Sequence, residues 1–142
     1  MNWIECKVAV EAINESGMLQ KEHRYYLLNA VTVAEAEERI HRELSTTTEK
    51  HEVESVKVVN YAEVYRSGGN KYYKARLGYL TLNEKNGVEK VNYVNVLVQA
   101  DDFEDAHDDI KKRLSSTLAD WSIYSLTETP LVDIYDEELD KE

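Results

Sequence analysis

The sequence predicts an α+β protein built from an internal duplication of a ββαβ unit. Shifting the chain by 70 residues aligns its two halves without a gap. Each half contains segments in which apolar and polar residues alternate, which is the period of a half-buried strand. Each half also contains one stretch with apolar residues on a single helical face. We therefore expect mainly antiparallel sheets, one helix packed per repeat, and a pseudo-twofold relation between the repeats.

The alignment of the halves depends on matches at apolar positions and at a turn glycine. Ten residues between positions 17 and 65 are identical to the residue 70 positions later. The identical pairs include Gly17 with Gly87, Leu27 with Leu97, Ile40 with Ile110, and Tyr65 with Tyr135. The predicted domains are a first ββαβ repeat at 1–65, a polar, glycine-rich linker at 66–70, a second repeat at 71–135 and an acidic tail at 136–142.

The strands are expected in the same order in both repeats. In the first repeat, alternation over 3–12 and an apolar run at 24–31 predict two strands that flank a turn at 14–17. In the second, the strands are 71–82 and 92–100, and Asn86-Gly87 between them is a hairpin signal because both residues tolerate positive φ. The last strands are 53–59 and 123–128, each continuing after a bend at Asn60 or Pro130 to Tyr65 or Tyr135.

The first strands of the two repeats differ in the parity of their apolar residues. Ile4 and Cys6 lie on even positions, whereas Tyr73 and Ala75 lie on positions that the alignment pairs with the opposite face. A shift of one residue turns every side chain to the other face. The strand 71–82 is therefore either covered on both sides or interrupted by a bulge, and the sequence leaves both alternatives open.

Each helix has a start signal and an apolar stripe. Thr32 stands three residues before Glu35, and Asp102 stands three before Asp105, which is the spacing of an N-cap and its capping partner. The apolar residues that follow are Ala36, Ile40 and Leu44 in the first helix and Ala106, Ile110 and Leu114 in the second. Such one-sided helices are expected to pack on a sheet.

Composition excludes several classes of protein. The net charge is −11, of which −5 lies in residues 133–142, and this acidity disfavours a broad surface for duplex nucleic acid. One cysteine allows neither an internal disulfide nor a cysteine-only zinc site. The sequence shows no signal peptide and no membrane-spanning run, so we expect a cytoplasmic protein without a membrane partner.

No sequence motif predicts catalysis. HExxH, GxGxxG, GxxxxGK[ST] and GxSxG are absent, and Ser67-Gly68-Gly69 lacks the rest of a phosphate loop. The acidic run 101–109 could hold a divalent cation, but acids at a helix start also match the helix dipole. Cys6 is expected in the core, and the histidines are scattered at His23, His41, His51 and His107. The sequence therefore predicts no catalytic residue, no metal ligand and no cofactor.

Basic and aromatic side chains gather near the start of the second repeat. The set comprises Lys71, Tyr73, Lys74, Arg76, Tyr79 and Tyr93. Such residues on a sheet can stack bases and contact phosphates. The alternative is an amphipathic strand with buried Tyr rings and solvated Lys heads. Tyrosine is also enriched at protein interfaces, to which other tyrosines could contribute, namely Tyr25, Tyr26, Tyr61, Tyr65, Tyr124 and Tyr135.

Several strings along the chain are similar to those of a known family. They are MNWIECKV at 1–8, YLLNA at 26–30, NYAEV at 60–64, NVLVQA at 95–100 and ETPLVD at 128–133. They resemble a family of unknown function found in Bacteroidetes and in phages that infect them, and the resemblance extends to about Tyr135. It implies a bacterial cytoplasm and a phage or mobile-element gene, and it transfers no activity and no site residue.

We expect a non-enzymatic binding or regulatory protein that engages a protein partner through a Tyr-rich sheet surface or a groove between the repeats. The alternative is a protein that binds single-stranded nucleic acid or a nucleotide through residues 71–79 and Tyr93. A metal-dependent enzyme at 101–109 is the third hypothesis. A homo-oligomer is left open, and we expect any site where the two copies differ or meet.

Overall fold

The computed structural model describes residues 1–46, 50–117 and 120–136, and it is an α+β protein with two helices and two mostly antiparallel sheets. The chain forms two compact units. Unit 1 contains Met1–Asn60 and the described residues from Pro130 onward, and unit 2 contains Tyr61–Thr129. Neither helix of the described chain has the length and apolar composition needed to cross a membrane.

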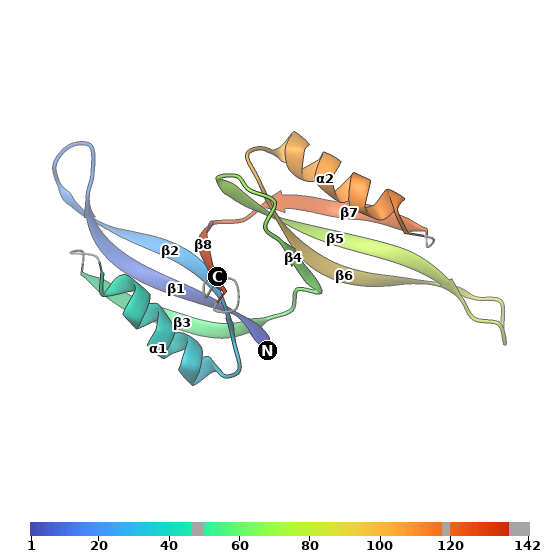
Figure 1. Cartoon of the computed structure of the whole chain (residues 1–142), viewed down its shortest axis with the longest axis horizontal. Coiled ribbons are helices and arrows are strands. Elements are labelled where there is room, and N and C mark those ends of the chain that lie inside the picture. The colour runs from blue at the N-terminus through green and yellow to red at the C-terminus, as the bar shows by residue number, and fades with distance from the viewer. Residues whose placement is uncertain (47–49, 118–119, 137–142) are drawn as a thin grey trace. The chain divides into compact units, whose positions relative to one another are not determined.

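Unit 1 is one helix on one four-stranded sheet. The strands are β1 (Asn2–Ile13), β2 (Leu19–Ala30), β3 (His51–Val59) and β8 (Leu131–Asp136), and their order in sheet A is β3-β1-β2-β8. The helix α1 (Val33–Leu44) lies along one face of this sheet (Figure 1). The apolar residues buried between them include Cys6, Val8, Val10, Tyr26, Leu28, Ile40 and Leu44.

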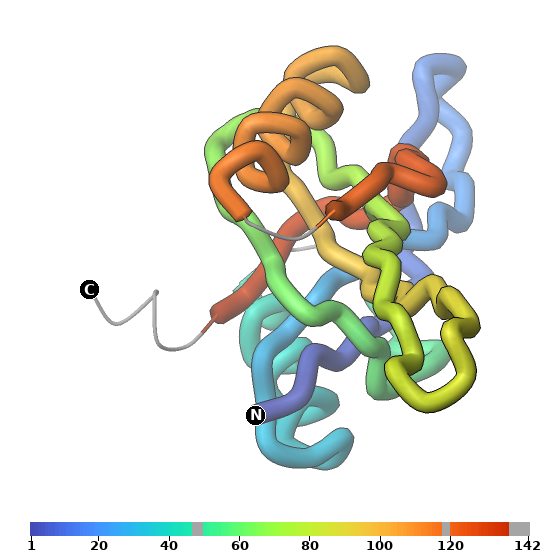
Figure 2. Tube along the Cα trace, turned by 90° about the vertical axis from the view of Figure 1, so that its right-hand side faces the viewer, coloured from blue at the N-terminus to red at the C-terminus, as the bar shows by residue number. Residues whose placement is uncertain are grey.

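Unit 2 repeats this arrangement. Its strands are β4 (Glu63–Tyr65), β5 (Lys71–Leu82), β6 (Glu89–Ala100) and β7 (Trp121–Glu128), in the order β4-β6-β5-β7, and α2 (Phe103–Ser115) covers one face. The buried core includes Tyr73, Ala75, Leu77, Val96, Val98, Ala106 and Ile110. In Figure 1 the β5–β6 hairpin extends past the end of α2, and in Figure 2 its yellow loop lies apart from the orange helix. Apolar residues near the tip of the hairpin, such as Leu82 and Val88, are exposed.

Both helices begin at the predicted caps. The Thr32 Oγ1 atom accepts a hydrogen bond from the Glu35 N–H at 3.1 Å, and the Asp102 Oδ1 atom accepts one from the Asp105 N–H at 2.8 Å. The Glu35 carboxylate in turn accepts from the Val31 N–H at 2.9 Å. Each cap therefore satisfies backbone donors that the first helical turn leaves without a partner.

The last strand of each predicted repeat belongs to the other sheet. β8 pairs in parallel with β2, and β4 pairs in parallel with β6. The compact units consequently differ from the repeats at 1–65 and 71–135, because each repeat contributes its final strand to the sheet of the other. Since the chain passes between the units at 60–61 and 129–130, the predicted linker at 66–70 does not join them. It lies inside unit 2.

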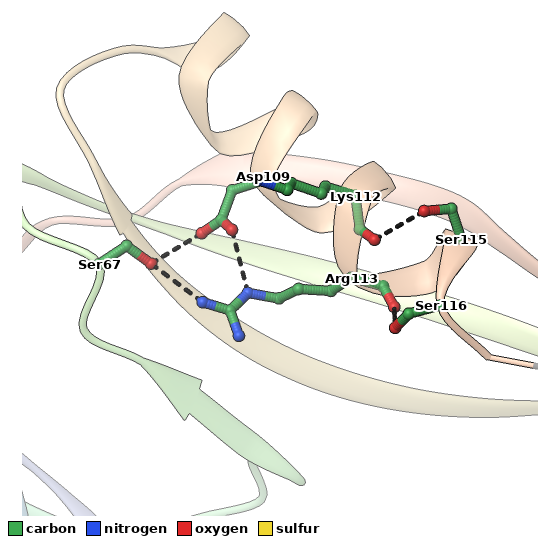
Figure 3. A network of polar contacts seen from close by, with 6 residues as sticks. All are labelled: Ser67, Asp109, Lys112, Arg113, Ser115 and Ser116. Carbon is green, nitrogen blue, oxygen red and sulfur yellow. Dashed lines mark hydrogen bonds and ion pairs between the residues drawn. The ribbon is translucent and has the colours of Figure 1, made fainter.

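The segment 66–70 is fastened to α2 by a polar network (Figure 3). The Ser67 hydroxyl donates to Asp109 Oδ2 at 2.7 Å, and the Arg113 guanidinium donates to Asp109 Oδ1 at 3.0 Å and to Ser67 Oγ at 3.3 Å. The Arg113 Cζ atom also lies 3.8 Å from the centroid of the Tyr65 ring. These contacts hold the end of β4 against the helix, and a cation over an aromatic face adds to the attraction.

The parity difference between the first strands comes from the length of a hairpin loop. Five residues, 14–18, separate β1 from β2, whereas six, 83–88, separate β5 from β6. In the strand register Ile4 pairs with Leu28 and Tyr73 with Val98, so Tyr73 and not Lys74 is the counterpart of Ile4. The ungapped alignment is therefore displaced by one residue over β1 and β5. A bulge does interrupt the pairing of β5 with β7, but β1 and β3 carry a matching one.

The predicted acidic tail begins within a strand. Asp136 is the last residue of β8 and is 9% exposed. The remainder of that prediction, residues 137–142, lies outside the described residues.

Gly69 is required by its surroundings, which leads to a stability prediction. Its φ is +132°, and a Cβ there would overlap the carbonyl carbon of Ala100. We expect Gly69→Ala to lower the free energy of unfolding by about 3 kcal/mol, because steric overlap adds to backbone strain. Gly17 is the control, since its φ is +79° but nothing lies near its added Cβ, and Gly17→Ala should cost about 1 kcal/mol. Equal losses in urea unfolding would contradict this account.

Burial of Cys6 leads to the prediction that the protein becomes less stable as the pH rises above 9. Burial, followed by the nearby charges of Glu37 and Glu5, raises the pKa of the Cys6 thiol from 9.0 to about 12. Between these values the unfolded chain releases the thiol proton while the native chain keeps it. Stability present below pH 9 should therefore fall by about 1.4 kcal/mol per pH unit above it. Urea unfolding measures this decline, and a Cys6→Val variant that declined as steeply as the wild type would refute the assignment.

Candidate functional site

On the side of sheet B opposite α2, Tyr72 and Leu97 are buried, and the exposed part around Arg76, here called the open face, carries two of the predicted cations. Lys74 and Arg76 are exposed at alternate positions of β5, so both side chains project from the same side of the strand. The residues directly opposite on β7 are Thr127 and Ser125, and Asn95 lies opposite Arg76 on β6. The open face therefore presents two positive charges among small polar side chains.

The structure divides the predicted basic and aromatic set between two faces. Tyr93 pairs with Gly78 and lies on the open face with Lys74 and Arg76. Tyr73 is buried under α2, and Tyr79 lies on the same side as Tyr73, with its ring 4.5 Å from that of Trp121. The division follows from alternation along β5, since Tyr73 and Tyr79 lie at odd positions and Lys74 and Arg76 at even ones.

Lys71 lies on the α2 side of β5 as well. Its Nζ atom is 3.3 Å from Glu128 Oε1. The hydrogen bond to Glu128, followed by the charge of that carboxylate, raises the pKa of Lys71. Lys71 therefore already has a carboxylate partner, unlike the cations of the open face.

An aromatic cluster completes the open face. The Arg76 Cζ atom lies 4.0 Å from the centroid of the Tyr93 ring, and the Tyr93 and Tyr124 rings meet edge to face with centroids 5.1 Å apart. The two residues are 46% and 51% exposed. Arginine over an aromatic face and an edge-to-face ring pair are both favourable arrangements. The guanidinium of Arg76 is thus held over the Tyr93 ring.

Tyr124 reaches this cluster because of a bulge and a glycine. The pairing of β5 with β7 passes from Ser125 to Ile123, which leaves Tyr124 as the extra residue of the bulge. A Cβ on Gly78 would overlap Cε2 of the Tyr124 ring, so the missing side chain at Gly78 makes room for the ring. Sequence reasoning placed Tyr124 only in a general group of interface tyrosines. The sequence feature that could have indicated its position is Gly78, a glycine inside an otherwise regular strand.

The open face is hollowed between these side chains. A shallow cavity of about 510 Å³ is lined by Lys74, Arg76, Tyr93, Asn95, Ser125 and Thr127. Within the described part of the chain, neither Lys74 nor Arg76 forms an ion pair with a carboxylate. The hollow can therefore accept an anionic group without first breaking an internal salt bridge.

The matching face of unit 1 is neutralised internally. Lys7, the counterpart of Arg76 by strand register, has its Nζ atom 4.0 Å from Glu54, and His23 Nδ1 lies 2.9 Å from the same carboxylate. Lys57 Nζ lies 3.9 Å from Glu5. In unit 2 the positions of Glu5 and Glu54 are occupied by Lys74 and Tyr124. The two faces thus differ in charge at equivalent positions of one scaffold.

The acidic run takes part in helix structure. Asp102 is the N-cap of α2, Asp101 accepts from the Asn70 N–H at 3.2 Å, and Asp109 binds Ser67 and Arg113. No three His, Cys, Asp or Glu side chains of the described residues come together as metal ligands would.

No histidine and no cysteine is among the residues that line the hollow of the open face. The rings of His41 and His51 are 5.6 Å apart, and His107 lies beside Phe103 on α2. Cys6 is buried in the core of unit 1.

The fold defines an α+β protein of two similar units with a basic and aromatic surface on one of them. The family model described as Domain of unknown function (DUF4494) matches residues 2–137, and the chain belongs to that family. No curated protein and no solved structure matches it.

Proposed function

We propose that the protein is a non-enzymatic binding protein that engages a negatively charged partner through the open face of sheet B. The observation that carries the proposal is the pair of cations Lys74 and Arg76. They lie without a carboxylate partner among the described residues, beside the exposed rings of Tyr93 and Tyr124. Cations that are not neutralised internally attract anions over short distances.

The acidity of the whole chain is compatible with such a local site. At physiological ionic strength charges separated by more than about 8 Å are largely screened. A partner seated on the open face would therefore interact mainly with Lys74 and Arg76 rather than with distant carboxylates. The net charge of −11 instead weakens unspecific attraction of polyanions to the rest of the surface.

A protein partner with an acidic segment is the second candidate for this surface. Arginine and tyrosine are enriched at the centres of protein interfaces, and Arg76 is stacked on Tyr93. A metal-dependent enzyme at 101–109 has less support, since Asp102 and Asp109 already serve as a helix cap and an ion-pair partner.

We also propose that the two units arose by internal duplication. The order of elements is the same in both, and Gly17 and Gly87 have similar positive φ values of 79° and 71° in equivalent turns. The bulges at Glu54 and Tyr124 are 70 positions apart. A cytoplasmic location and a phage or mobile-element origin are proposals that the family resemblance carries, and the neighbouring genes would test the origin.

Chromatography on immobilised heparin tests for a local polyanion site without assuming the natural ligand. We expect the wild type to be retained at low salt despite its charge of −11. The double variant Lys74→Gln/Arg76→Gln should flow through, because each cation removed eliminates the release of about one counterion. The matched control is Lys7→Gln/Lys57→Gln on unit 1, which removes the same charge and should be retained like the wild type.

Two results would contradict the proposal. One is wild-type protein that flows through at low salt. The other is retention that the control lowers as much as the open-face variant, since this would mean that total charge, and not the open face, determines binding.

A further inference from the structure

We infer that the anionic partner of the open face is a single-stranded nucleic acid, with a base stacked on Tyr124 and phosphates bound by Lys74 and Arg76. This inference rests on the proposed function and adds the chemical class of the ligand. It follows from the way in which rings, cations and hydrogen-bonding groups are combined on one face of a sheet.

Tyr124 provides the stacking surface. Its ring lies against Gly78, which has no side chain to displace it, and the residue as a whole is 51% exposed. Arg76 already covers one face of Tyr93, so Tyr93 holds the guanidinium beside Tyr124. Bases stack on both aromatic rings and guanidinium planes. A ligand with planar groups can stack on the Tyr124 ring, whereas an acidic peptide would leave that ring without a stacking partner.

Lys74 and Arg76 provide the phosphate contacts. They are two residues apart on β5, which places their Cα atoms about 7 Å from each other along the strand. Two cations side by side can therefore contact successive phosphates of one strand. Asn95, Ser125 and Thr127 line the same hollow, and their amide and hydroxyl groups can bond to base edges or phosphate oxygens.

A duplex fits this surface less well than a single strand. The bases of a duplex are stacked inside it and cannot reach a ring that lies on a sheet. Duplex binding also requires many phosphate contacts, and the described open face supplies two cations, Lys74 and Arg76. A single strand exposes its bases, and proteins that bind it combine a basic track with aromatic rings.

Fluorescence anisotropy of the full chain tests the inference with four labelled probes at low salt. The probes are single-stranded DNA and RNA oligonucleotides of about ten nucleotides, a duplex of the same length, and an oligo-glutamate peptide. We expect one or both single strands to bind more tightly than the duplex and the peptide. For a single strand with two phosphate contacts, the slope of the logarithm of the association constant against the logarithm of the salt concentration should be about −1.4. In Arg76→Gln, with one contact left, the slope should be only about −0.7.

Variants of the aromatic cluster separate stacking from charge. We expect Tyr124→Ala to weaken single-strand binding roughly 5- to 150-fold, the loss of one stacked base. Gly78→Ala should weaken it in the same direction because its Cβ displaces the ring. The matched control is Phe103→Ala, which removes the ring of a residue that is likewise 51% exposed but lies on α2. This variant should bind within about twofold of the wild type. Circular dichroism checks that each variant is folded.

Each result decides between the proposals. Heparin retention that depends on Lys74 and Arg76, without single-strand binding, overturns the inference and leaves the proposed function, and tight binding of oligo-glutamate would then identify an acidic protein segment. Equal binding of the duplex, or single-strand binding that neither Tyr124→Ala nor Gly78→Ala lowers, also overturns the inference. If the wild-type protein binds neither heparin nor any oligonucleotide, both proposals are overturned.

Discussion

The edges of β2 and β6 impose the constraint on which the rest of this architecture depends. An open strand edge presents unpaired backbone N–H and C=O groups, and a parallel neighbour cannot be supplied by a tight turn. Each repeat pairs the backbone groups of one edge by giving its last strand to the sheet of the other repeat: β8 pairs with β2, and β4 pairs with β6. Neither sheet is therefore complete within one continuous stretch of sequence, and each repeat needs the other for its fourth strand.

Local signals predicted the elements well, because their causes lie within a few residues. The caps at Thr32 and Asp102 satisfy nearby backbone donors, and the apolar stripes of both helices face the sheets. The strand exchange had no such signal. Tyr65 and Tyr135 match each other in sequence, and either final strand could lie beside either sheet. Only the path of the chain after residues 60 and 129 decides which sheet receives it.

The candidate site shows how a small error in register becomes an error in function. The six-residue loop of the β5–β6 hairpin displaces the ungapped alignment by one position, and in a strand one position exchanges the two faces. The comparison with the first repeat therefore left open which side of 71–82 is buried, and Tyr73 and Tyr79 were grouped with Lys74 and Arg76. Alternation along a single strand separates them, and both tyrosines lie on the α2 side of the sheet. Tyr124 was named only among the general interface tyrosines, because a bulge, which alternation cannot reveal, brings it to the open face.

The comparison of the two units explains why a basic surface can exist on an acidic protein. Both units use the same strand order and the same bulge, so the scaffold itself determines neither charge nor ligand. On unit 1, Glu5 and Glu54 hold the neighbouring cations in ion pairs. Lys74 and Tyr124 at the equivalent positions of unit 2 remove those carboxylates and add a cation and a ring. These replacements, together with that of Lys57 by Thr127, thus give unit 2 a face that can attract an anion, without a change in fold.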